Sequence, residues 1–131
     1  LIATQNFNLP IWVGFVLKDD FRLLSGDSMI DTLNMVKDYP VDTVLLNCNP
    51  LDRTVTAAEN LVTSWPNKWG VYPNAGENMP TKDGEFVSKL DDESFCKAIQ
   101  DYITLGASVV GSCCGSTPNT VRKISNMIKK L

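Results

Sequence analysis

Two patterns of hydrophobic and polar positions alternate along the chain. Short, mostly apolar runs, typical of strands buried on both faces of a parallel sheet, lie at residues 11–16, 43–47, 69–72 and 107–111. Each run precedes a segment in which apolar residues recur every three or four positions, as in an amphipathic helix. These segments cover residues 28–38, 54–65, 91–105 and 118–131. Four strand-then-helix units of this kind predict a parallel sheet with right-handed crossovers.

The predicted helices begin and end at ordinary signals. Asp91 or Asp92 caps the third helix and Gly106 closes it, whereas Thr117-Pro118 supplies a cap and a first-turn proline for the fourth. The inward faces of the second and fourth helices are expected to hold Val55, Ala58, Val62 and Trp65, and Val121, Ile124, Ile128 and Leu131.

Length limits the architecture. The 131 residues suffice for one domain with a hydrophobic core, and no break in composition divides them. A complete (β/α)8 TIM barrel needs roughly 250 residues. The expected fold is therefore a single α/β domain over residues 1–131 that amounts to half a barrel.

Charge and hydropathy exclude several classes of partner. The 12 basic and 15 acidic residues give a formal net charge of -3, and the basic residues are not clustered beyond Lys129-Lys130. Nucleic acid and anionic membranes are therefore not expected partners. No run approaches the roughly 18 apolar residues that span a bilayer, and the first residues lack the features of a signal peptide. We expect a cytoplasmic protein.

Three of the four cysteines follow predicted strands. Cys48 comes directly after the second apolar run, and Cys113 and Cys114 follow the fourth. In an α/β barrel the carboxyl ends of the strands meet on one face, where active sites are built. Adjacent cysteines bridge only through a strained ring, which favours free thiols. Cys96 instead shares a predicted helix face with Ile99, where it is expected to act as a small buried hydrophobe.

The residue types narrow the chemistry of such a site. The chain contains no histidine, so a zinc site must be built from cysteine and completed by oxygen or by a substrate. Three thiolates around Zn²⁺ carry a formal charge of about -1, and a fourth thiolate takes it to about -2. Such an electron-rich centre keeps a bound sulfur deprotonated yet nucleophilic, which suits alkyl transfer onto sulfur.

Three segments resemble the signature segments of the homocysteine S-methyltransferase family in order and spacing. They are Asn47-Cys48, the Tyr-Pro-Asn-Ala-Gly-Glu segment at residues 72–77, and the Gly-Ser-Cys-Cys-Gly-Ser-Thr-Pro segment at residues 111–118. The cysteine-pair segment is the most specific of the three. The resemblance extends over nearly the whole chain, from residue 11 to the C-terminus.

This resemblance implies a zinc-dependent (β/α)8 barrel, of which the chain is similar to the last four units. It implies that Cys48, Cys113 and Cys114 bind zinc and that the homocysteine thiolate is the fourth ligand. A methyl group then passes to that thiolate and gives methionine. The implied donor is S-methylmethionine, S-adenosylmethionine or a methylated corrinoid, and the first half of the barrel is implied to hold the amino group of homocysteine.

Asn47, Asn74 and Glu77 are candidate substrate-binding residues. Ligating thiolates and substrate carboxylates both need nearby hydrogen-bond donors, which the two asparagine amides supply. Asparagine is equally common in turns for purely local reasons, so a structural role stays open for both.

Other functions remain open. The cysteines are also compatible with a non-catalytic thiol module, which cycles through a vicinal disulfide or stores zinc, and with an inactive fragment of the methyltransferase. The turn at residues 115–118 is a possible anion site at a helix N-terminus, although that leaves the three thiols unexplained. Both outer strands of a half barrel lack a neighbour, so we expect self-association or pairing with the N-terminal half.

Overall fold

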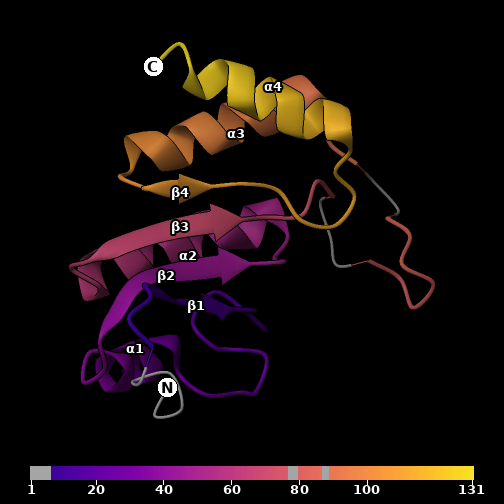
Figure 1. The fold of residues 1–131 in the computed structure, drawn as a ribbon. Coiled ribbons are helices and arrows are strands. Elements are labelled where there is room, and N and C mark those ends of the chain that lie inside the picture. Colours follow the sequence, from indigo (N-terminus) through magenta and orange to yellow (C-terminus); the bar gives the residue numbers. More distant parts are fainter. Residues whose placement is uncertain (1–6, 77–79, 87–88) are drawn as a thin grey trace.

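The computed structural model describes residues 7–76, 80–86 and 89–131. Four parallel strands form one sheet in the order β1-β2-β3-β4. A helix follows each strand, as the sequence predicts (Figure 1). The elements are β1 (Ile11–Phe15), α1 (Met29–Val36), β2 (Val41–Asn47), α2 (Leu51–Ser64), β3 (Lys68–Tyr72), α3 (Asp92–Thr104), β4 (Val109–Val110) and α4 (Pro118–Ile128).

The hydrophobic core lies between the sheet and the helices. Leu46 of β2 and Val71 of β3 are fully buried there, against Leu33 of α1 and Phe95 of α3. The helices begin where their caps place them: the Asp91 carboxylate accepts from the first backbone N–H groups of α3.

Three details of the elements differ from the prediction. β4 contains only Val109 and Val110, because only these two residues pair with β3. α2 begins at Leu51, and its buried face is shifted, so that Val55 and Val62 are exposed. Of the four residues expected on the inward face of this helix, only Ala58 and Trp65 are buried. The helix also buries Thr54, Ala57 and Leu61, which were not in the expected set.

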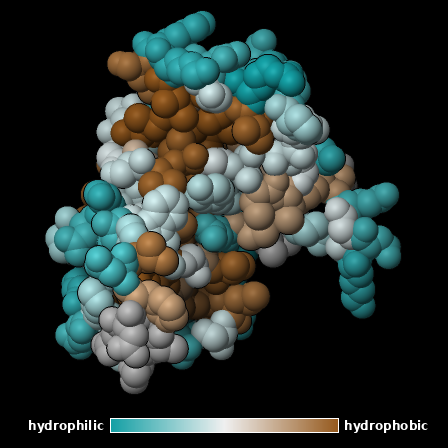
Figure 2. Space-filling model, in the orientation of Figure 1, coloured by the Kyte–Doolittle hydropathy of each residue, from teal (hydrophilic) through white to brown (hydrophobic). Residues whose placement is uncertain are grey.

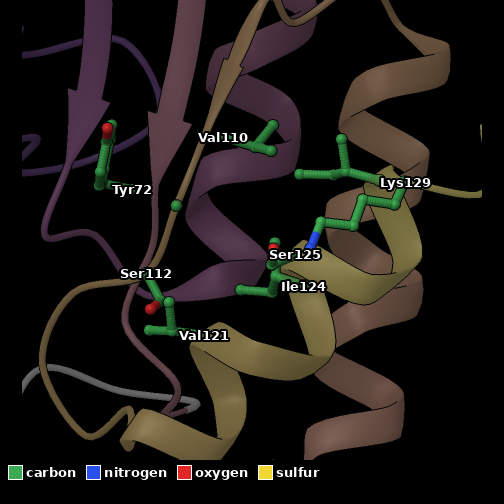
Figure 3. Close-up of a pocket in the computed structure, with 9 residues that line it drawn as sticks. Tyr72, Val110, Ser112, Val121, Ile124, Ser125 and Lys129 are labelled. Atoms are coloured by element: carbon green, nitrogen blue, oxygen red, sulfur yellow. The ribbon is translucent and has the colours of Figure 1, made fainter.

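The apolar face of α4 is only partly covered. Ile124 is buried, whereas Val121 and Ile128 are exposed, contrary to the expected inward face. Leu131 is exposed as well. The reason is that α4 lies beside β4, which is an edge strand of the sheet in the part of the chain that the structure describes. A groove of about 490 Å³ remains between β4 and α4, lined by Val110, Ser112, Val121, Ile124 and Ile128 among others (Figure 3).

Three glycines of the sheet and its strand exits lie close to side chains of a neighbouring strand. Side chains of one strand lie across a glycine of the next: Asn47 over Gly14, Leu45 over Gly70, and Tyr72 over Gly111. A Cβ atom at Gly14 would come within 2.5 Å of the Asn47 amide nitrogen. These glycines therefore leave room for the side chains of the neighbouring strand.

The surface shows where the fold is open. Trp12 on β1 is half exposed, and Figure 2 shows apolar surface both below α4 and in the lower part of the molecule. β1 and β4 are the two edge strands of the sheet. Within the described part of the chain, no helix combines the length and apolar character required to cross a membrane.

Candidate metal centre

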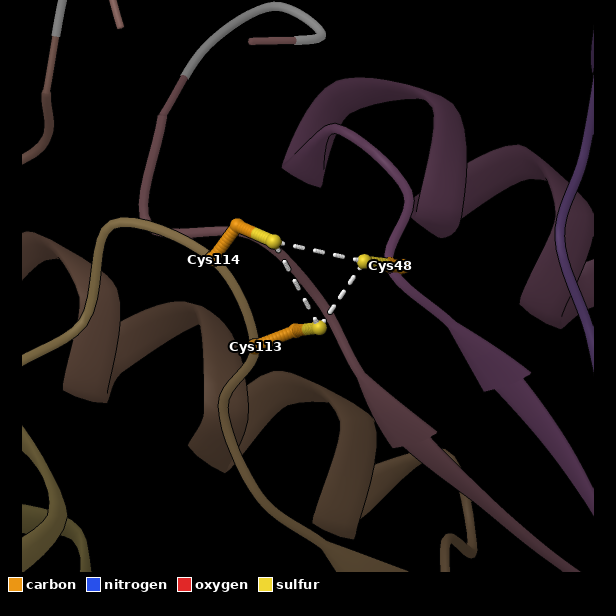
Figure 4. A group of neighbouring side chains, drawn as sticks. All are labelled: Cys48, Cys113 and Cys114. Carbon is orange, nitrogen blue, oxygen red and sulfur yellow. Dashed lines mark hydrogen bonds between the residues drawn. The ribbon is translucent and has the colours of Figure 1, made fainter. Parts of the chain in front are cut away.

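The sulfur atoms of Cys48, Cys113 and Cys114 converge at the carboxyl end of the sheet. The Sγ atom of Cys48 lies 2.9 Å from that of Cys113 and 3.5 Å from that of Cys114, and the adjacent pair is 3.9 Å apart. Figure 4 shows the three side chains pointing toward one another from two loops. Among the described residues this is the one group of three or more metal-binding side chains.

Cys48 owes its direction to an unusual backbone conformation. Its φ of 58° lies in the left-handed region, which costs energy for any residue with a side chain. Two hydrogen bonds from the neighbouring strand exit hold it there. The Cys48 N–H donates to the Tyr72 carbonyl at 2.9 Å, and the Asn74 side-chain amide donates to the Cys48 carbonyl at 3.1 Å. The chain therefore turns sharply at the end of β2 and aims the thiol along the edge.

Cys113 and Cys114 are held from the same segment. The Cys113 N–H donates to the Pro73 carbonyl, and the Ala75 N–H donates to the Cys114 carbonyl, both at 2.9 Å. Gly115, with a φ of 79°, then reverses the chain, which only glycine does without strain. Residues 72–75 thus join both cysteine loops and set their separation.

Asn49 is a site residue that sequence reasoning missed. It is fully buried; its side-chain oxygen accepts the Leu17 N–H at 2.7 Å, and its backbone carbonyl accepts the Asn74 N–H at 2.9 Å. Asn49 directly follows Cys48. Its two hydrogen bonds therefore connect the Cys48 loop to the loop after β1 and to the segment after β3. Asn49-Pro50 in the sequence indicates only a turn, so no local signal identified this role.

The candidate substrate-binding residues are placed differently from one another. Asn47 ends β2 and lies across Gly14, while Asn74 is fully buried beside Cys48. The side-chain oxygen of each is buried and has no hydrogen-bond partner among the described residues. Glu77 lies outside the described residues. Cys96 is on α3, partly buried against the core, and is not in the thiol cluster.

Burial and neighbouring thiols control ionisation at the site. Burial, reinforced by hydrogen bonds and like-charge repulsion from Cys113 and Cys114, raises the pKa of Cys48 to about 12. The metal-free protein therefore keeps this thiol protonated at neutral pH. A bound cation reverses that preference, because a coordinating thiol loses its proton.

The three thiols are a donor set that suits a zinc ion. Tetrahedral zinc with Zn–S bonds of about 2.3 Å places its sulfurs about 3.8 Å apart. The Cys113–Cys114 separation of 3.9 Å matches that spacing, and the other two separations are shorter. Three cysteine ligands with a fourth position left open is the donor number of a catalytic zinc site.

Comparisons with solved structures establish the fold. The homocysteine methyltransferase MmuM from Escherichia coli resembles the chain with a TM-score of 0.72 in its metallated form and 0.76 in its apo form, at 24% and 23% identity. The matches cover 90% and 95% of this chain, but only 35% and 42% of the MmuM chains. Because MmuM is a TIM barrel, the predicted fold class is confirmed: the chain is a four-stranded parallel α/β part of such a barrel.

Comparisons with curated sequences agree. Homocysteine S-methyltransferase 2 from Zea mays is 32% identical over 135 residues, which covers 99% of this chain and 39% of the relative. The selenocysteine methyltransferase from Astragalus bisulcatus is 31% identical over 133 residues, or 98% of this chain and 39% of the relative. The chain thus spans about two fifths of the length of these relatives.

The family model described as homocysteine S-methyltransferase matches residues 1–128, nearly the full chain. With the cysteine cluster at the carboxyl end of a parallel sheet and the barrel likeness of its fold, the chain belongs to the homocysteine S-methyltransferase family.

Proposed function

We propose that the chain provides the metal-binding half of an enzyme that transfers a methyl group to the thiolate of homocysteine and gives methionine. The observation that carries this proposal is the convergence of three cysteine Sγ atoms, within 4.8 Å of one another, at the carboxyl end of a parallel sheet. That is the face on which barrel enzymes build their active sites.

Cys48, Cys113 and Cys114 would hold the zinc ion. When bound, zinc stabilises a substrate thiol as the thiolate at neutral pH. Residues 72–75 keep the two cysteine loops in register, through hydrogen bonds to all three cysteines. The fourth position around such an ion would be left for the substrate sulfur.

Asn47 and Asn74 are proposed to orient the substrate. Both carry a buried amide oxygen without a partner among the described residues, and a buried acceptor without a donor is costly. A hydrogen-bond donor brought in by the substrate would satisfy such an acceptor. Glu77 is proposed as a third contact because of its place in the family's second signature segment.

The transfer balances as a nucleophilic displacement. The substrate thiol gives its proton to solvent, and a sulfur electron pair forms the new S–C bond to the methyl carbon. The bond between that carbon and the donor breaks, and its electron pair stays on the donor. The donor is a sulfonium compound, S-methylmethionine or S-adenosylmethionine, or a methylated corrinoid.

We further propose that residues 1–131 form one domain that corresponds to the last four βα units of the barrel. β1 and β4 are the edge strands of the described sheet, and they would pair with the first half of the barrel or with a second copy of the chain. The first half would supply the donor site and further contacts to homocysteine. A cytoplasmic, reducing location is part of the proposal, because the three thiols must stay reduced.

A cobalt-substituted sample tests the thiolate step on the chain itself. Homocysteine should change the visible spectrum of the cobalt-loaded chain, whereas homoserine, which carries oxygen in place of sulfur, should not. Equal spectra with both compounds would argue against a substrate thiolate at the metal. Activity is tested in a barrel completed with the first half of the Zea mays relative: methionine formation from none of the three donors would refute methyl transfer.

One observation favours a second candidate, a non-catalytic thiol module. The Cys48 and Cys113 sulfurs are only 2.9 Å apart, so oxidation would need little movement. In that case two thiols lose two electrons and two protons to an added disulfide oxidant, which is reduced to two thiols. Thiol titration separates the candidates. Three thiols protected by one equivalent of zinc support the methyltransferase, and a reversible disulfide without zinc affinity supports the module.

A further inference from the structure

The segment between β3 and α3 folds back onto the cysteine turn. Its two ends meet, because the Leu90 N–H donates to the Ala75 carbonyl at 2.9 Å and Gly76 pairs with Lys89 in an antiparallel bridge. Residues 81–85 form a tight turn, closed by a hydrogen bond from the Thr81 N–H to the Glu85 carbonyl. Compact loops whose ends are close are frequently functional. Phe86 follows the turn directly.

The Phe86 ring lies against two glycines from different loops. A Cβ atom at Gly115 would come within 3.0 Å of two ring carbons, and one at Gly76 within 2.7 Å of a third, with two further ring carbons nearer still. Gly76 belongs to the segment after β3, and Gly115 directly follows Cys114. The ring therefore occupies the space that side chains would fill at both positions and bridges the two loops.

The two glycines that the ring contacts are sequence neighbours of the residues that position Cys114. Ala75, next to Gly76, donates its N–H to the Cys114 carbonyl at 2.9 Å. Cys114 is the most exposed of the three clustered cysteines. Among the described residues, Phe86 is not part of the main core, and its ring lies close to Gly76 and Gly115. An apolar cover strengthens a backbone hydrogen bond by excluding competing water.

We propose that Phe86 is a positioning residue for the metal centre. Its ring clamps the turn that carries Cys113 and Cys114 onto residues 75 and 76 and fixes the direction of the Cys114 thiol. The statement about the metal rests on the proposed function, whereas the effect on the thiol does not. The two are therefore measured separately.

The first measurement is the alkylation rate of Cys114 in the reduced, metal-free chain, followed by mass spectrometry at each cysteine. F86A should raise that rate about tenfold, the factor that corresponds to about 1.4 kcal/mol of local stability. F86Y, which keeps the ring, should behave like the wild type. F21A removes an exposed aromatic side chain from another loop and should also leave the rate unchanged.

A second variant tests the contact rather than the residue. Gly76 does not have a positive φ, so its backbone accepts alanine and the Phe86 ring is the obstacle. G76A should therefore accelerate Cys114 alkylation as F86A does. In the double variant F86A/G76A the added methyl group has room, and the rate should equal that of F86A alone.

The outcomes separate the two proposals. Wild-type alkylation rates in both F86A and G76A, with an unchanged circular dichroism spectrum, would overturn the role of Phe86, and so would independent, multiplicative effects in the double variant. The zinc-loaded chain should also release zinc to a chelator faster in F86A. If no variant binds zinc while the Cys114 rates change as expected, the proposed function fails and the role of Phe86 stands.

Discussion

The Sγ atoms of Cys48 and Cys113 lie 2.9 Å apart, although 65 positions separate the two residues. The strands that precede them, β2 and β4, are not neighbours, because β3 lies between them. Residues 72–75 at the end of β3 bridge the gap with hydrogen bonds to both cysteine loops. The thiol cluster is thus a product of the parallel strand order, and its geometry depends on β3.

Replacement of a single cysteine should abolish zinc binding. Because three thiolates share one ion, we expect about one zinc per chain in the wild type and none in C48S, C113S or C114S. C96S is the matched control, since Cys96 lies on α3 outside the cluster. Metal analysis after reconstitution and desalting measures the stoichiometry. Equal loss in C96S would contradict this ligand set.

Asn74 should control metal affinity through Cys48. N74A removes the amide that donates to the Cys48 carbonyl, and loss of such a supporting contact typically weakens metal binding about 10- to 100-fold. Competition with a chromophoric chelator measures the affinity. Y102F is a suitable control, because it also removes a buried hydrogen bond, from Tyr102 to the Leu51 carbonyl, at a position outside the thiol cluster. Equal zinc affinities in the two variants would refute the special role of Asn74.

Tyr102 should make the fold sensitive to alkaline pH. Burial raises the pKa of its hydroxyl well above the ordinary value of about 10, so the folded chain keeps it protonated. Above about pH 10 the unfolded chain ionises this group and the folded chain does not, so the free energy of unfolding falls as pH rises. The Y102F substitution should lower the free energy of unfolding by about 1 kcal/mol at neutral pH, because it removes one buried hydrogen bond. Urea unfolding at several pH values tests this: parallel pH profiles for Y102F and wild type would be the contrary result.

The open edges should cause the chain to self-associate. Among the described residues, β1 and β4 are the edge strands of the sheet, and the groove beside β4 exposes apolar side chains of α4. Light scattering after size exclusion should detect a dimer at micromolar concentration. V121K places a charge at the groove and should shift the equilibrium from dimer to monomer. V62K, which places a charge on α2, should leave the dimer intact. A stable wild-type monomer without a companion polypeptide would refute the expectation.

Much of the fold was predictable because its signals are local. Each apolar run and each helical repeat is contained in a few turns of chain, and caps such as Asp91 lie at the predicted starts. The faces of α2 and α4 were less predictable. A helical repeat states which residues share a face, but the burial of Val55 or Val121 depends on which neighbouring element is present to cover it.

The sequence by itself determined the four strand-then-helix units and the position of three cysteines at strand exits, because both follow from residue order and spacing. Only the tertiary structure decided how those exits meet. The left-handed turn at Cys48, the buried tie at Asn49 and the Phe86 ring between two glycines all depend on contacts between segments distant in the chain. Such contacts arise because the parallel packing of the strands brings distant residues together. Neither of the two local sequences contains a signal that predicts the contact.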